Sequence, residues 1–221
     1  MKTVLVVSPH PDDETLGCGG TLLKHRAYGD STYWLIATKM VRDAGYSRAR
    51  IQCREKEIKE VALRYGFKDI LQLQFVTTRL DVTPMAEIIE AVGEAIKKVK
   101  PDWLYVPYPH DIHTDHRAVY DAVASAAKWF RGPSIKRIMA YETLSETGFS
   151  LEADSGFKPN VYSNIENYLD DKIEIMKLYK GEMAMFPFPR SEEAIKALAA
   201  LRGTEAGFKA AEAFVLLRER I

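Results

Sequence analysis

The 221-residue sequence has little of what marks secreted, membrane-spanning or disulfide-rich proteins. Its two cysteines, Cys18 and Cys53, are too few for a disulfide scaffold, which favours a reducing, cytoplasmic setting. No apolar run approaches the roughly 18 residues that a membrane span needs. The apolar run at residues 4–7 is too short for a signal peptide and leads to Pro9 without a small-residue cleavage site, so we interpret it as a first strand.

An excess of positive charge is also absent, because 31 lysines and arginines balance 31 aspartates and glutamates. Nucleic-acid-binding and peripheral membrane proteins usually carry a basic surplus, so we expect neither kind of partner. The neutral net charge is compatible with a homo-oligomer. Hydrophobic residues make up 47% of the chain, which is ordinary for a globular protein and argues against disorder.

What the sequence does contain is an alternation of short β-type runs and amphipathic helical patterns. We expect strands at residues 3–7, 32–37, 70–73, 103–106 and 135–141, and helices at residues 15–28, 50–65, 84–98 and 118–129. This alternation predicts an α/β fold: a Rossmann-like, doubly wound, mostly parallel sheet of strand order 3-2-1-4-5 with helices on both faces. We assign residues 1–142 to this core.

The pattern changes after Glu142. Residues 144–158 are polar and aperiodic, and we expect an ordered loop near the site. Further elements are expected as a short strand at residues 161–163 and helices at residues 170–179 and 191–201, whereas residues 210–220 fit either a helix or a strand. The economical interpretation is a single domain over residues 1–221, in which residues 143–221 form a C-terminal α/β extension that contributes to the substrate site.

Histidine is scarce, with five in the chain, yet four of the five lie in two short stretches. The first stretch follows the first strand and contains His10, Asp12, Asp13 and Glu14. Three adjacent carboxylates repel one another, and a divalent cation would stabilise them; an imidazole with a carboxylate is a ligand set that suits zinc. His10 and Asp13 can therefore converge on one metal while Asp12 points to the substrate side.

Two structural explanations compete with a metal site at this stretch. Asp12 or Asp13 could cap the following helix, where the helix dipole would also favour Glu14. The glycines of residues 17–20 could form a phosphate-binding turn. Capping does not explain His10, however, and the glycines do not fit the dinucleotide fingerprint, while three carboxylates would repel a phosphate. We therefore favour a functional site.

The second stretch follows the fourth strand and places three histidines and two aspartates within residues 110–116. The alternative to a functional site is a solvated loop capped by Thr114 or Asp115, but this density of imidazoles is unlike a structural segment. Strands one and four are neighbours in the order 3-2-1-4-5, and their carboxyl ends flank the crevice where ligands bind. We therefore expect the two stretches to face one another across one site.

Six short segments together carry a family resemblance. They are Pro-His-Pro-Asp-Asp-Glu at residues 9–14, Gly19-Gly20, Arg54-x-x-Glu57, His-x-Asp-His at residues 113–116, Arg202-Gly203 to Gly207, and Ala211-Glu212-Ala213-Phe214. With these segments the sequence resembles the LmbE-like family of zinc-dependent deacetylases, which includes N-acetylglucosaminyl-phosphatidylinositol deacetylase. The resemblance spans nearly the whole chain.

The resemblance implies a catalytic metal held by His10, Asp13 and His116, with water in the open position. The metal would be zinc or another divalent transition metal. Two histidines and one carboxylate with an open fourth position are typical of catalytic rather than structural zinc. Zinc lowers the pKa of bound water to about 7 and polarises a carbonyl, which suits the hydrolysis of an amide.

The resemblance also implies roles for residues around the metal. Asp12 would be the general base, and His113 would stabilise the oxyanion, if cationic at that point, or protonate the leaving amine. Asp115 would orient the imidazole ring of His113 without contacting the substrate itself. Arg54 would contact polar or phosphate groups of the substrate.

The activity so implied is removal of the acetyl group from an N-acetyl amino sugar resembling GlcNAc, or from its conjugate. Two alternatives stay open: an amidase acting on another N-acylated small molecule, and a non-catalytic metal- or sugar-binding module, against which Asp12 and His113 argue. His25 is expected on the surface of a helix. For His110 the sequence leaves substrate contact, coordination and a place at the rim open.

Overall fold

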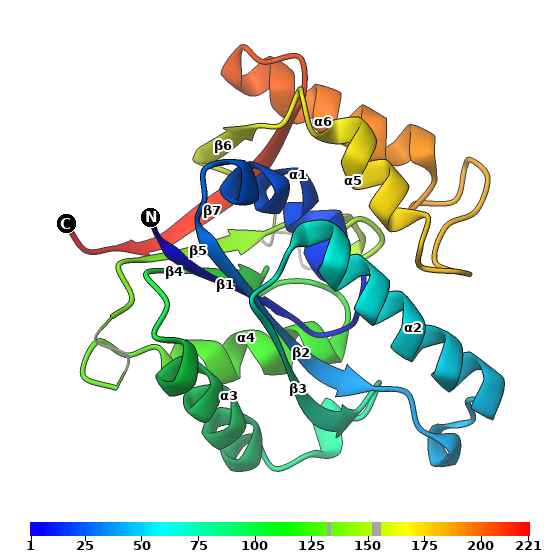
Figure 1. Cartoon of the computed structure of the whole chain (residues 1–221), viewed down its shortest axis with the longest axis vertical. Coiled ribbons are helices and arrows are strands. Elements are labelled where there is room, and N and C mark those ends of the chain that lie inside the picture. Colours follow the sequence, from blue (N-terminus) through cyan, green and yellow to red (C-terminus); the bar gives the residue numbers. More distant parts are fainter. Residues whose placement is uncertain (132–133, 152–155) are drawn as a thin grey trace.

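The computed structural model describes residues 1–131, 134–151 and 156–221, and it places one central sheet between two layers of helices (Figure 1). The strands are β1 (Thr3–Ser8), β2 (Ser31–Lys39), β3 (Asp69–Val76), β4 (Trp103–Pro107), β5 (Arg137–Tyr141), β6 (Val161–Asn164) and β7 (Ala211–Glu219). The helices are α1 (Asp13–Ala27), α2 (Arg48–Tyr65), α3 (Met85–Val99), α4 (Thr114–Ala126), α5 (Leu169–Met176) and α6 (Glu192–Ala206). Short 3-10 turns lie at Arg42–Ala44, Leu80–Val82 and Thr147–Phe149.

The sheet confirms the predicted core topology and extends it. Its strand order is β3-β2-β1-β4-β5-β7-β6, and the pairs from β3 to β5 are all parallel. The ambiguous C-terminal segment is the strand β7, which pairs antiparallel with both β5 and β6. Phe214 of β7 lies opposite Tyr141 on one side and Val161 on the other, so the extension adds two strands to the same sheet.

The two faces of the sheet bury alternate residues of the same strand. In β1, Leu5 and Val7 pack in a core with residues of α3 and α4, whereas Val4 and Val6 pack with residues of α1, α2 and α5. Figure 1 shows α3 and α4 on one side of the sheet and α1, α2 and α5 on the other. A strand covered on both faces has no polar side, which explains the continuous apolar run at residues 4–7.

Local signals set the ends of several helices. Ser47 and Ser191 accept hydrogen bonds at the starts of α2 and α6, and Gly66 and Gly207 end these helices in the left-handed conformation. Helix α4 begins at Thr114, four residues before the predicted start, because the side chain of His113 caps it. In the described part of the chain, no helix combines the length and the apolar character needed to cross a bilayer.

The expected loop at residues 144–158 is described only in part, since residues 152–155 lie outside the described residues. The described part contains the turn Thr147–Phe149, and Glu146 lines the cavity of the candidate site.

The glycines of α1 allow neighbouring side chains to approach the helix closely. A Cβ atom at Gly17 would lie 2.2 Å from the ring of Tyr141, and one at Gly20 would lie 2.7 Å from the side chain of Ile165. Close packing therefore accounts for these glycines without a phosphate-binding turn.

The side chains of a buried ion pair, Lys172 and Glu212, form hydrogen bonds with the backbone of α1. Glu212 of β7 accepts hydrogen bonds from the N–H groups of Gly20 (2.8 Å) and Thr21 (2.7 Å). Lys172 of α5 donates to the carbonyl of Leu16 and to Glu212, both at 2.8 Å. Two side chains of the C-terminal extension thus bond to the backbone of the central turns of α1.

Candidate active site

The candidate site lies where β1 and β4 end. These strands pair in parallel, so the loop between β1 and α1 meets the loop between β4 and α4 at the same edge of the sheet. The first loop carries His10, Asp12 and Asp13, and the second leads into His113 and His116. The expectation that the two histidine-containing stretches face one another is confirmed.

His10, Asp13 and His116 form a group with the composition of a metal site. Their candidate ligand atoms all lie within 4.8 Å of one another. The Asp13 Oδ2 atom is 3.4 Å from His10 Nδ1 and 3.4 Å from His116 Nε2. The buried Nε2 atom of His116 has no hydrogen-bond partner among the described residues. An unsatisfied imidazole nitrogen beside a carboxylate fits a divalent transition metal.

A carboxylate lies behind each of these two imidazoles. Asp111 Oδ2 is 2.8 Å from His116 Nδ1, and Asp115 Oδ2 is 2.9 Å from His10 Nε2. Thr147 in turn donates to Asp111 at 2.6 Å. Each ring therefore turns its remaining nitrogen toward Asp13, the arrangement that fixes metal-ligating histidines in proteins. Sequence reasoning counted Asp111 in the dense stretch but gave it no role.

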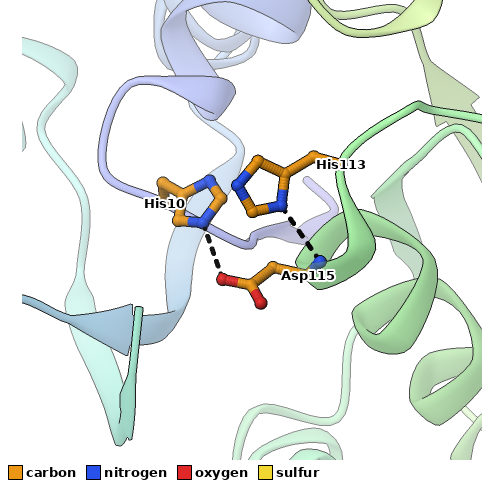
Figure 2. A group of neighbouring side chains, drawn as sticks. All are labelled: His10, His113 and Asp115. Carbon is orange, nitrogen blue, oxygen red and sulfur yellow. Dashed lines mark hydrogen bonds and ion pairs between the residues drawn. The ribbon is translucent and has the colours of Figure 1, made fainter. Parts of the chain in front are cut away.

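Asp115 contacts a different histidine from the one expected. Figure 2 shows its carboxylate against His10, while only its backbone N–H reaches His113, at 3.0 Å from Nδ1. The N–H groups of Thr78 (2.7 Å) and Leu80 (3.1 Å) donate to the same carboxylate. The reason is local: His113 is the N-cap of α4, so its ring bonds to the backbone of the first turn and the Asp115 side chain is left for His10.

His113 lies beside His10, with ring centroids 4.6 Å apart (Figure 2). Because Nδ1 accepts the N–H of Asp115, the hydrogen-bond network assigns the proton of the ring to Nε2. Burial, together with the charges of the neighbouring His10 and His116, lowers the pKa of His113 to about 4. In this arrangement Nε2 is the donor nitrogen of the ring.

Asp12 lies in the cavity wall with an unusual backbone. Its φ is 141°, and within the described chain its side chain makes no capping hydrogen bond, although it is the N-cap residue of α1. Burial raises the pKa of its carboxyl, and the charge of Asp13 raises it further, while Arg54 and Arg190 oppose this rise. Capping by the Asp12 side chain, one of the structural explanations above, is thus absent here.

Glu14 faces away from the metal-binding group and supports the loop. Its carboxylate accepts the N–H of Asp12 at 3.1 Å and the hydroxyl groups of Thr15 (2.6 Å) and Tyr179 (2.5 Å). Burial raises its pKa to about 7. The third carboxylate of the motif therefore holds the backbone at Asp12.

Arg54 lines the cavity but is already engaged by protein groups. It is 5% exposed, it donates to the carbonyl of Pro11 and to Glu182, and its Nε lies 2.9 Å from Glu57 Oε2. Its contacts hold the loop that carries the site, and the substrate contact implied by the resemblance stays a prediction.

The cavity beside the metal-binding group has a volume of about 230 Å³. It is lined by charged, polar and apolar side chains that include Asp12, Tyr46, Gln74, His113 and Arg190. A space of this size with convergent polar groups suits a small polar molecule such as a sugar unit.

The other two histidines lie outside this cavity. His110 is exposed and contacts the ring of Tyr108. The expectation that His25 is a surface residue is wrong: it is 6% exposed, with Nδ1 2.8 Å from Asp30 and Nε2 3.0 Å from the hydroxyl of Tyr105. Helical periodicity alone did not indicate that the end of α1 is covered by the sheet.

Comparisons with known proteins agree with this architecture. The family model described as "PIG-L: GlcNAc-PI de-N-acetylase" matches residues 5–127. A probable N-acetyl-alpha-D-glucosaminyl L-malate deacetylase 2 of Bacillus cereus is 32% identical over 82% of this chain and 84% of that protein. Diacetylchitobiose deacetylase of Thermococcus kodakarensis is 26% identical over 96% of this chain and 82% of that enzyme. The crystal structure of a conserved protein from Thermus thermophilus superposes with a TM-score of 0.79 at 27% identity, covering 100% of this chain and 97% of that one.

Proposed function

This chain belongs to the PIG-L family of GlcNAc-PI de-N-acetylases, and from that premise we propose that it is a metal-dependent hydrolase that removes the acetyl group from an N-acetyl amino sugar or its conjugate. One observation carries the proposal. The candidate metal ligands His10 and Asp13, the buried carboxylate of Asp12 and the ring of His113, whose donor nitrogen is Nε2, line one cavity.

His10, Asp13 and His116 would hold the metal, which we propose to be zinc or another divalent transition metal. When bound, such an ion polarises the carbonyl of the acetyl group and lowers the pKa of a water molecule. The unsatisfied nitrogen of His116 supports this assignment. Asp111 and Asp115 would act as positioning residues that hold the two imidazole rings in the required orientation.

Asp12 and His113 would carry the proton transfers. Asp12 would accept a proton from the attacking water, since its carboxylate lines the cavity. The Nε2–H group of His113 would donate a hydrogen bond to the oxygen that becomes negative as the carbonyl is attacked. Collapse of that tetrahedral species would break the C–N bond, the proton taken up by Asp12 would pass to the nitrogen, and acetate and a free amine would leave.

The test measures acetate release from a panel of N-acetylated amino sugars, with and without a chelator. We expect His116→Ala to lose both metal and activity, and Asp12→Ala to keep the metal while turnover falls by orders of magnitude. Asp121→Ala, at an exposed position of α4, is the matched control and should behave like the unmodified protein.

Two results would count against the proposal. Full activity of Asp12→Ala would show that Asp12 is not the base. Release of acetate from no member of the panel, with the metal confirmed bound, would favour a binding module or a different acyl group.

A further inference from the structure

Three arginines at the site cavity converge on a single carboxylate, and two of them, Arg54 and Arg190, line the cavity together with it. Glu182 lies in the segment between α5 and α6, and Arg50, Arg54 and Arg190 all contact it. Its Oε1 atom is 3.1 Å from Arg50 Nη2 and its Oε2 atom is 3.3 Å from Arg190 Nη2, while Arg190 Nε also donates to the Glu182 carbonyl at 2.9 Å. We refer to these four residues as the arginine wall.

A second carboxylate, Glu57, pairs with two members of the arginine wall. Glu57 Oε1 is 3.0 Å from Arg50 Nη1, and Glu57 Oε2 is 2.9 Å from Arg54 Nε. Each of the three guanidinium groups of the arginine wall thus has Glu182 as a carboxylate partner, and two of them also share Glu57.

The other charged side chains that line the cavity are balanced in sign. Apart from Asp12, Asp13 and the histidines, its charged lining residues in the described ranges are Lys39, Arg54, Arg190, Glu55, Glu146 and Glu182. Lys39 is exposed and donates to Gln74 at 2.9 Å, so solvent screens its charge. An anion that enters beside the arginine wall must compete with Glu182 for its partners or stay unpaired, and both outcomes are unfavourable.

We propose that Glu182 makes this site selective for N-acetyl amino sugars whose remaining part carries no carboxylate or phosphate. This inference rests on the proposed deacetylase function and narrows its substrate class to uncharged glycosides such as an N-acetylated disaccharide. Arginines beside a sugar site would otherwise favour an acidic conjugate. Glu182 weakens that preference because its carboxylate already pairs with all three guanidinium groups.

The experiment compares kcat/KM for one uncharged and one acidic substrate, N,N′-diacetylchitobiose and N-acetylglucosaminyl malate. For the unmodified, metal-loaded enzyme we expect the disaccharide to be preferred by about tenfold or more. Glu182→Gln keeps the shape of the side chain and frees the arginines, so we expect it to raise the ratio for malate over disaccharide by about tenfold.

Glu55→Gln is the matched control, because it removes one negative charge from the same cavity at an exposed position. We expect it to change the ratio by less than about threefold. An equal shift in both variants would overturn the role of Glu182, since it would reflect the general field of the cavity.

The unmodified enzyme tests the proposal even if Glu182→Gln does not fold. A preference for the malate conjugate would overturn the inference and leave the deacetylase function standing. Absence of acetate from both substrates and from the wider panel, with the metal bound, would overturn the deacetylase function and the inference with it.

Discussion

Lys172→Met tests the role of the buried ion pair in α1. The substitution keeps the apolar stem of the side chain and removes the ammonium group, so Glu212 retains its two backbone N–H partners but loses its counter-charge. Both side chains are about 5% exposed, and solvent therefore screens the lost charge little. Removing one partner of such a pair costs about 3–5 kcal/mol, a large part of the about 5–15 kcal/mol that stabilises a typical domain.

The measurement is the free energy of unfolding from urea denaturation, with the melting temperature as a second readout. For a chain of this length about 1 kcal/mol corresponds to about 2–4 °C, so we expect the melting temperature to fall by roughly 6–20 °C. Lys177→Met is a matched control at the end of α5, because Lys177 pairs with Glu174 and Glu192 on the exposed surface. We expect the free energy of unfolding of that variant to stay close to that of the unmodified protein, because solvent screens the exposed pair.

A double variant separates the lost charge from the lost hydrogen bond. Lys172→Met with Glu212→Gln removes both charges; the glutamine oxygen can accept one of the two backbone N–H groups, and its amide nitrogen faces the other. We expect it to recover part of the loss. If Lys172→Met destabilises no more than Lys177→Met, the ion pair does not support α1 and the argument fails.

Three further predictions concern other parts of the molecule. Asp111→Asn should lower metal affinity by about 10–100-fold, measured by competition with a chromogenic chelator, because it weakens the hold on His116. Gly17→Ala should destabilise the fold by at least about 1 kcal/mol in urea denaturation, since its Cβ would overlap the buried ring of Tyr141. Burial lowers the pKa of His25 from its ordinary value of about 6.5, despite the favourable bond to Asp30 and with small contributions from Lys2 and Lys24 that act in the same direction as burial. The unfolded chain therefore binds this proton more readily, so His25 lowers the free energy of unfolding as the pH drops below about 6.5. Between pH 7 and pH 5.5 the free energy of unfolding of the unmodified protein should therefore fall relative to that of His25→Gln. An unchanged difference between the two proteins would contradict the assignment.

The core fold follows from patterns that lie close together in the sequence, whereas the choice of His10, Asp13 and His116 as candidate ligands came from the family resemblance. Apolar runs at strand length, helical periodicity and the position of His10 and His116 after two strands were sufficient to place both stretches at one edge of the sheet. The parallel order itself brings the ends of β1 and β4 together, so no side-chain detail was needed.

Contacts that depend on side-chain direction could not be predicted in this way. The Asp115 carboxylate reaches His10 because the ring of His113 takes the capping position. The spacing of these residues in the sequence is equally compatible with a contact between Asp115 and His113. Glu182 lies 128 residues from Arg54 in a segment without a periodic pattern, and nothing in its local sequence indicates the arginines. The burial of His25 likewise depends on how the sheet covers the end of α1.

The hydrogen bonds between Glu212 and α1 have a consequence for the order in which the chain can fold. Its partner Gly20 lies 192 residues earlier, so a growing chain on the ribosome has made all of β1 to α6 before the residue that bonds to the backbone of α1 exists. Helix α1 begins at Asp13, beside the metal-binding group. The site loop therefore gains its final support only when β7 enters the sheet, and a chain interrupted before residue 212 is expected to stay inactive.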